Sequence, residues 1–132
     1  MSTTAAKRKI DNFQDLRAWQ TSKALAIKIY QVTKTFPATE QFGLTSQMRR
    51  SSVSISSNIA EGFSRKTKKD KQQFYQTALG SVTELQSQLE IAQSVGLVSK
   101  TDCEDLKATL IKSHKLINGL IKSAGDWHVK HT

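Results

Sequence analysis

Polar side chains between Gln47 and Gly62 have the types and the spacing to form hydrogen bonds and ion pairs between helices. At 100° per residue in an α-helix, one arc of this segment is apolar or small and the next arc is polar. The first arc consists of Leu44, Met48, Ser51, Ile55, Ile59 and Gly62, and the second of Gln47, Arg50, Ser54, Asn58 and Glu61. An unpaired buried polar group costs roughly 1–3 kcal/mol, so the polar arc needs partners wherever the apolar arc packs. We therefore expect a helix that packs in two directions, with its polar residues setting the register.

The segment from Phe74 to Ala92 repeats this arrangement and supplies the expected partners. Its apolar arc consists of Phe74, Ala78, Val82, Leu85, Leu89 and Ala92, and its polar arc of Thr77, Ser81, Glu84 and Gln88. A chain that folds back about residues 66–67 places Arg50 opposite Glu84. We predict a partly buried ion pair between them, which specifies register more than it adds stability. The hydrogen-bond network around the pair would include Gln47, Ser54, Ser81 and Gln88.

Basic residues crowd the short connection between these two segments. They are Arg65, Lys66, Lys68, Lys69 and Lys71, with only Asp70 to offset them, and Arg49 faces away from the apolar arc nearby. The chain has a formal net charge of +9 and a pI near 9.9. Clustered cations bind phosphates through counterion release with little reading of sequence, so we expect these six residues to contact an RNA or DNA backbone. A solvated surface and an acidic protein partner are the alternatives. Base stacking is less supported, because the aromatic residues are not interleaved with the lysines.

Patterns for catalysis or metal binding are weak. The three histidines, His114, His128 and His131, have no Cys, Asp or Glu at zinc-ligand spacing on one helix face. Acidic neighbours oppose thiolate formation at Cys103, so we expect that residue to pack in the core. Asn58 and Glu61 could serve a small hydrolase, but general acid–base chemistry needs a pocket and a second titrating group, so we assign both residues to the structural network between the helices. We predict a protein with no catalytic residue, metal or cofactor.

We expect these residues to lie on helices. The 132-residue chain has only one proline and six glycines, and so few helix-breaking residues over long periodic segments favour helices. We expect helices at residues 13–36, 40–63, 68–95 and 102–124 within a bundle domain of residues 12–125. A flexible basic arm, residues 1–11 with Lys7 to Lys9, should precede the bundle, and a loose tail, residues 126–132, should follow it. Asn12 and the capping-box spacing from Thr101 to Glu104 predict helix starts, and Gly96 predicts a helix end. Rods of about 35–40 Å with short connections predict an all-α, antiparallel, up-down-up-down four-helix bundle.

The first predicted helix is apolar around about 220° of its circumference, whereas a surface helix needs roughly 100°. One arc consists of Leu16, Trp19, Ala26, Ile27, Tyr30 and Thr33, and the neighbouring arc of Leu25, Ile29, Val32 and Phe36. We interpret the excess as a subunit interface, because an exposed patch of that size invites association. The alternative is a first helix that lies centrally under the other three.

The sequence also resembles a known family. The matching motifs are Phe13-x-x-Leu16-x-x-Trp19, Phe36-Pro37-x-x-Glu40-x-x-Gly43-Leu44-x-x-Gln47-x-x-Arg50, Ser54-Ile55-x-x-Asn58-Ile59-Ala60-Glu61-Gly62 and Ala78-x-Gly80-Ser81-x-x-Glu84-Leu85. They resemble the four-helix bundle proteins encoded in 23S rRNA intervening sequences, which are similar to the accessory variability proteins of diversity-generating retroelements. The resemblance covers about residues 13–123. It implies a bacterial, barrel-like homopentamer, and the retroelement relatives imply a basic surface that binds RNA or DNA and a reverse transcriptase.

This chain departs from the family pattern at four serines, Ser51, Ser52, Ser56 and Ser57. Relatives tend to have alanines there, with a proline in place of Ser56, so we expect a straighter and more polar second helix. A lone cysteine and no apolar run of membrane-spanning length predict a cytoplasmic protein without a membrane partner. The sequence thus predicts a non-enzymatic, ring-like homo-oligomer that binds nucleic acid as an accessory to a reverse transcriptase or ribonucleoprotein. A protein scaffold with an acidic partner and no nucleic-acid role is the alternative.

Overall fold

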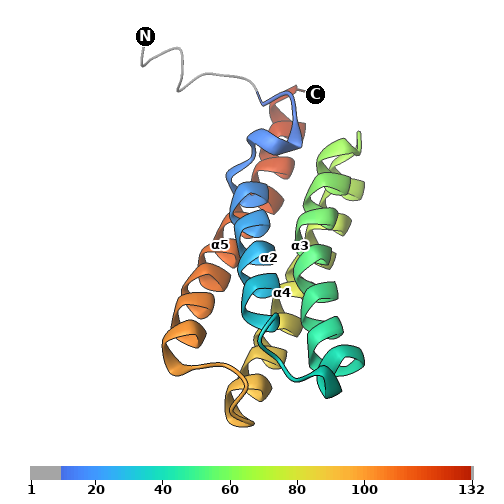
Figure 1. The fold of residues 1–132 in the computed structure, drawn as a ribbon. Coiled ribbons are helices and arrows are strands. Elements are labelled where there is room, and N and C mark those ends of the chain that lie inside the picture. The colour runs from blue at the N-terminus through green and yellow to red at the C-terminus, as the bar shows by residue number, and fades with distance from the viewer. Residues whose placement is uncertain (1–9, 132) are drawn as a thin grey trace.

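The computed structural model describes residues 10–131, with side chains as far as Ala124 (Figure 1). The short helices are η1 (Phe13–Asp15), η2 (Ala38–Glu40) and η3 (Gln41–Thr45), and the long helices are α2 (Arg17–Thr33), α3 (Ser46–Ser64), α4 (Lys68–Ser94) and α5 (Lys100–His131). Most of the basic arm expected at residues 1–11, including Lys7 to Lys9, lies outside the described residues. Residues 10–131 contain no strand.

The four long helices form the antiparallel, up-down-up-down bundle that the sequence predicts (Figure 1). Each long helix runs opposite to the one before it, and α2 packs against both α3 and α5, while α4 packs against the same two helices. α2 is therefore one of four equivalent rods and does not lie centrally under the other three. Among the described residues, none of these helices has an apolar stretch long enough to cross a lipid bilayer.

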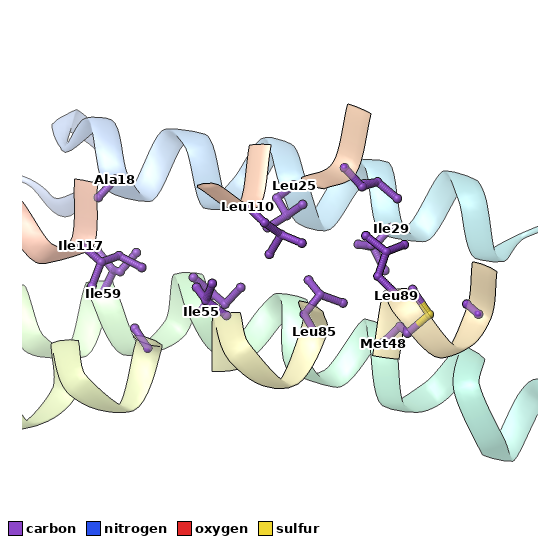
Figure 2. Packing of buried hydrophobic residues seen from close by; sticks show 14 of the residues in the cluster. Ala18, Leu25, Ile29, Met48, Ile55, Ile59, Leu85, Leu89, Leu110 and Ile117 are labelled. Carbon is purple, nitrogen blue, oxygen red and sulfur yellow. The ribbon is translucent and has the colours of Figure 1, made fainter. Parts of the chain in front are cut away.

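The core fills the space between the four rods with aliphatic side chains from each of them (Figure 2). Leu25 of α2, Ile55 of α3, Leu85 of α4 and Leu110 of α5 are all fully buried. The apolar arcs predicted for the second and third helices are buried, except that Leu44 and Phe74 are only half-buried. Cys103 is also fully buried. The helical period of the sequence therefore identifies the core, because only the inward arc of each helix is excluded from water.

Helix starts and ends depart from the sequence expectation in the first half of the chain. Leu16 has extended backbone angles and separates η1 from α2, and α2 ends at Thr33 rather than at residue 36. The second long helix begins at Ser46, not near residue 40, because the backbone at Gly43 leaves the helical region (φ −110°, ψ −118°). The Glu40 carboxylate accepts a hydrogen bond from the Leu44 amide at 3.2 Å across this kink. Periodicity could not show the kink, because the apolar arc of this helix begins only at Leu44, after it.

The second half of the chain follows its local signals more closely. Gly96 has φ 81°, and the Leu97 amide donates to the carbonyl of Ala92 at 2.9 Å, as in a Schellman ending of α4. α5 begins at Lys100, and Ser99 is its cap, since the Ser99 hydroxyl accepts from the Asp102 amide at 3.1 Å. The predicted cap at Thr101 is therefore wrong by two positions. α5 continues to His131, so the loose tail expected at residues 126–132 is helical as far as that residue.

Candidate nucleic-acid interface

The polar arcs of α3 and α4 meet along the contact between these helices. Arg50 forms an ion pair with Glu84 and donates from Nε and Nη2 to the Gln47 side-chain oxygen at 3.1 and 2.9 Å. The hydroxyls of Ser54 and Ser81 lie 2.8 Å apart. The structure therefore brings together the residues that the two polar arcs place opposite each other.

Three further side chains complete this α3–α4 network. The amide of Asn58 donates to the carbonyl oxygen of Ser54 at 2.8 Å. The Ser51 hydroxyl donates to the Gln88 side-chain oxygen at 2.7 Å, and the Gln88 amide lies 3.5 Å from a Glu84 carboxylate oxygen. Ser51 belongs to the serine-rich positions, and it is fully buried. Serine in place of alanine therefore adds a neutral hydrogen bond between α3 and α4.

The Arg50–Glu84 pair is partly buried, as the sequence predicts, although much of each side chain stays in contact with water. The side chains of Arg50 and Glu84 are 51% and 40% exposed. Both lie at the outer edge of the helix contact, where water solvates the charges. A pair solvated to this extent contributes about 0–1 kcal/mol, so the buried part of the network is its neutral hydroxyl and amide groups.

Both candidate residues for a small hydrolase make side-chain contacts along α3. The Glu61 carboxylate forms an ion pair with Arg65 of the next turn at 2.9 Å, and Asn58 is held in the α3–α4 network. The other nucleophile considered, Cys103, has its Sγ 3.0 Å from the Gln93 side-chain oxygen. Burial is the largest effect and raises the pKa of Cys103. Among the nearby charges, Lys107 lowers this pKa, and Glu90 and Glu104 raise it. These contacts give each side chain a structural role.

The basic cluster lies at the end of the bundle where α3 ends and α4 begins, and we call it the basic end (Arg65, Lys66, Lys68, Lys69 and Lys71). Arg65, Lys66 and Lys69 are exposed, whereas Lys68 and Lys71 are half-buried. Within residues 10–124, the ion pairs of the chain leave out all four lysines of the basic end. Lys28 and Lys107, by contrast, pair with Asp105 at 3.0 Å and Glu90 at 2.6 Å.

Two cations of the basic end are held against aromatic rings. The Arg65 guanidinium lies 4.6 Å from the centroid of the Phe74 ring. The Lys71 ammonium lies 5.3 Å from the centroid of the Phe63 ring and donates to the Phe63 carbonyl at 2.7 Å. Burial lowers the pKa of Lys71, because the folded chain withdraws its charge from water. These contacts hold Arg65 and Lys71 in defined positions.

A cavity of about 610 Å³ opens beside the basic end, and we call it the end cavity. Its lining comes from the chain before α2 and from the adjoining ends of α3, α4 and α5: Ile10, Leu16, Phe63, Arg65, Lys66, Lys71, Tyr75, Leu120, Ser123 and Ala124. Tyr75 is only 3% exposed, and burial raises its pKa to about 12. The cavity therefore places three cations next to an apolar and aromatic wall.

The pattern of the sequence does not predict this meeting of aromatic rings and cations. Phe63 and Tyr75 come from two helices, and the fold rather than the spacing along the chain sets them beside Arg65, Lys66 and Lys71. One signal is present in the sequence. A Cβ atom at Gly62 would lie 2.6 Å from Cε1 of Tyr75, so Gly62 permits the close approach of α4, as a glycine at a helix contact can indicate.

Arg49, which the sequence predicts as a nucleic-acid contact together with the residues of the basic end, lies apart from them. Its position is about 24 Å from Arg65 along the axis of α3, at 1.5 Å per residue. The Arg49 Nε donates to the Thr33 hydroxyl at 2.9 Å, and its guanidinium lies 4.6 Å from the centroid of the Tyr30 ring. Arg49 therefore joins α3 to α2, because its charged guanidinium contacts both Thr33 and the Tyr30 ring.

Arg49 also lines a second cavity of about 490 Å³, which we call the α2 groove. Its other lining residues are Trp19, Lys23, Ala26, Ile27, Tyr30, Gln31, Lys34 and Ser56. Ile27 and Tyr30 are 48% and 45% exposed, whereas Leu25 and Ile29 on the neighbouring arc are fully buried. One of the two apolar arcs of α2 thus fills the core, and the other leaves apolar surface exposed on a single chain.

Comparisons with known proteins agree with this fold. The family model of the 23S rRNA-intervening sequence protein matches residues 14–119. The structure is similar to the 1.70 Å crystal structure of a protein of unknown function from the S23 ribosomal protein family of Bacteroides thetaiotaomicron VPI-5482. The TM-score is 0.74 at 23% sequence identity, and the match covers 80% of this chain and 95% of the other. No curated protein matches the sequence.

Proposed function

This chain belongs to the 23S rRNA-intervening sequence protein family, and we propose that it is a non-enzymatic, homo-oligomeric protein that binds the backbone of RNA or DNA. The basic end is the binding surface in this proposal. The family description relates the chain to ribosomal RNA, which favours an anionic polymer over a small-molecule substrate. Binding would serve an accessory or scaffold role.

The observation that carries the proposal is the state of the lysines in the basic end. Lys66 and Lys69 are exposed, Lys68 is half-buried, and none of them takes part in the ion pairs found within residues 10–124. Among the lysines of residues 10–124, these ion pairs include Lys28 and Lys107, so the lack of an ion pair is shared with most other lysines there, and what distinguishes the basic end is that four lysines lie close together. Uncompensated cations in one place attract phosphates and release counterions when they bind.

The α2 groove supports the oligomeric part of the proposal. An exposed apolar surface that includes Ile27 and Tyr30 favours association, and a second copy of the chain would remove it from water. We propose a pentameric ring, as the family resemblance implies. A ring repeats the basic end in every subunit, so that one phosphate backbone would contact several clusters. A reverse transcriptase or a ribonucleoprotein is the further partner in this proposal.

Triple alanine variants test the binding surface. Lys66→Ala, Lys68→Ala and Lys69→Ala together remove three cations of the basic end. The matched control is Lys100→Ala, Lys112→Ala and Lys115→Ala, which removes three lysines elsewhere on the bundle. We expect the first variant to bind a fluorescent RNA or DNA much more weakly and the second to bind it nearly as the wild type does. The slope of log K against log salt should become shallower by about 0.7–0.9 for each phosphate that the variant no longer neutralises.

Two outcomes would contradict the proposal. Equal affinity of the wild type at 50 and 200 mM salt would rule out a phosphate mechanism, because about 10³-fold or more is lost over that range when six or more phosphates are contacted. Equal effects of the two triple variants would rule out the basic end as the surface. If the wild type retained an acidic protein but no nucleic acid, the alternative scaffold function would replace the proposal.

A further inference from the structure

The end cavity combines features that a phosphate backbone alone does not need. We propose that it receives the base and phosphate of one unstacked nucleotide, so that the protein binds single-stranded nucleic acid or a frayed strand end in preference to a closed duplex. This inference rests on the proposed nucleic-acid function and names the form of nucleic acid that the same site takes. It also revises the expectation from the sequence that base stacking is poorly supported.

The wall of the end cavity suits a nucleobase. Phe63 contributes the half-buried aromatic ring on which a base can stack, the buried Tyr75 ring (3% exposed) lies behind it in the wall, and Leu16 and Leu120 contribute aliphatic surface. Tyr75 is held in place by its contact with Gly62, so its ring is a fixed part of the wall. Every base has a flat face that stacks on aromatic side chains, which gives binding with little sequence preference. The volume of about 610 Å³ falls within the range of about 300–1,000 Å³ that is usual for ligand pockets.

The cations suit the phosphate that follows the base. Arg65, Lys66 and Lys71 all line the same cavity, so their charges lie beside the aromatic wall. Lys71 is held by the Phe63 carbonyl at 2.7 Å. Its ammonium is partly withdrawn from water, and within residues 10–124 it has no carboxylate in an ion pair. A phosphate would supply the missing anion, and charge-assisted hydrogen bonds to phosphate are stronger than neutral ones.

A closed duplex cannot use this cavity without losing base pairing. Its bases are stacked and paired, and extruding one of them costs unstacking and unpairing energy, least where the strand is already single. A duplex can still meet Lys68 and Lys69, which do not line the cavity. The site therefore predicts two levels of affinity: phosphate contacts that both forms make, and a base contact that only an unpaired nucleotide makes.

A matched pair of leucine variants tests the inference. Phe63→Leu keeps the apolar volume and the backbone carbonyl that binds Lys71 but removes the ring from the cavity wall. Phe74→Leu removes a ring that also lies under a cation, in this case Arg65, but that does not line the cavity. Affinities of both variants and the wild type are measured by fluorescence anisotropy, with a labelled single-stranded 16-mer and a blunt duplex of the same length at one salt concentration.

We expect the wild type to bind the single strand more tightly than the duplex. Phe63→Leu should lower the single-strand affinity about tenfold, as removal of one stacking ring does, and should leave duplex affinity unchanged. Phe74→Leu should preserve the wild-type ratio of the two affinities. Equal losses for both nucleic acids, or no loss with Phe63→Leu, would overturn the inference while the triple lysine variant could still support backbone binding. If the wild type bound neither nucleic acid, the proposed function itself would fail.

A second variant covers the case in which Phe63→Leu does not fold. Ser123 is exposed and lines the cavity, so Ser123→Leu fills part of the space without changing any charge or core residue. The control Ser87→Leu changes a serine of α4 that does not line the cavity and lies about 18 Å along the axis from Tyr75, at 1.5 Å per residue. We expect only Ser123→Leu to reduce the preference for the single strand. Adenosine 5′-monophosphate should compete for the wild-type site better than inorganic phosphate at the same concentration, and equal competition would contradict a base contact.

Discussion

The basic end and the α2 groove both contain arginine and lysine, but the two surfaces hold their cations differently. In the α2 groove, Arg49 donates to Thr33 and lies over the Tyr30 ring. In the basic end, the lysines remain outside the ion pairs found within residues 10–124. The comparison teaches that cations alone do not identify a binding surface. Each surface has one cation that joins two helices, Arg49 in the α2 groove and Lys71 in the basic end, and the basic end differs by the cluster of Lys66, Lys68 and Lys69 beside it.

The largest expected effect is on assembly, which we assign to the α2 groove and not to the basic end. Ile27→Glu places a carboxylate on the exposed apolar arc of the α2 groove, where a subunit contact would withdraw it from water, and this desolvation penalty can exceed what an ion pair with Lys23 or Lys34 of the groove returns. The mass measured by light scattering should fall to the 14.7 kDa of a single chain. Ile111→Glu is the control, because Ile111 is similarly exposed on α5 at 52% but does not line the groove. A wild-type mass near 14.7 kDa would contradict the ring, and the role assigned to the α2 groove with it.

A pair of glycine variants tests how tightly the basic end is packed. Gly62→Ala places a Cβ atom 2.6 Å from Cε1 of the buried Tyr75 ring, and overpacking of this kind costs about 1–3 kcal/mol. The higher helix propensity of alanine offsets up to about 1 kcal/mol of that loss. Gly80→Ala meets nothing within 4 Å, so it should stabilise the fold by about 0.5–1 kcal/mol. Urea unfolding should therefore give opposite signs for the two variants, and a stabilising Gly62→Ala would show that Tyr75 is free to move.

The two tyrosines, Tyr75 and Tyr30, should contribute differently to the pH dependence of folding stability. Burial raises the pKa of Tyr75, which lines the end cavity, to about 12 from the ordinary value of 10.0. Between these pH values the unfolded chain loses the tyrosine proton while the folded chain keeps it, so this residue makes stability fall as pH rises. Tyr75→Phe should reduce the loss of melting temperature between about pH 10 and 12. Tyr30→Phe is the control in the α2 groove, since Tyr30 is 45% exposed. Equal pH profiles for the wild type and Tyr75→Phe would contradict the role of Tyr75.

The smallest effect concerns the ion pair that lies on neither surface. A double-mutant cycle with Arg50→Ala and Glu84→Ala should give a coupling energy of about 0.2–1 kcal/mol, because both side chains keep much of their contact with water at 51% and 40% exposure. Thermal or urea melts of the four proteins measure it. A coupling above about 3 kcal/mol would mean that the pair behaves as a buried one, for example because a subunit contact covers it. That result would extend the interface beyond the α2 groove.

The sequence predicts the network between α3 and α4 better than it predicts the site at their end. Ser54 and Ser81, like Arg50 and Glu84, lie opposite each other because one short connection joins two regular helices, and this sets the register. No short connection of this kind sets the positions of all the residues that line the end cavity. Leu120 and Ser123 reach it from the far end of α5, and the distance along the chain between them and Phe63 carries no information about their contact.

The sequence by itself determined the four helices, the side of each that faces the core, the Gly96 ending and the pairing of α3 with α4. These features follow from helical period and hydrogen bonding within a few residues, which are local properties of a chain. Only the tertiary structure decided how much of Arg50–Glu84 stays in water, that Arg49 binds α2, and that cations and aromatic rings share one cavity. Exposure and cavities depend on how far apart whole helices stand, and that distance is set by the packing of all the core side chains together.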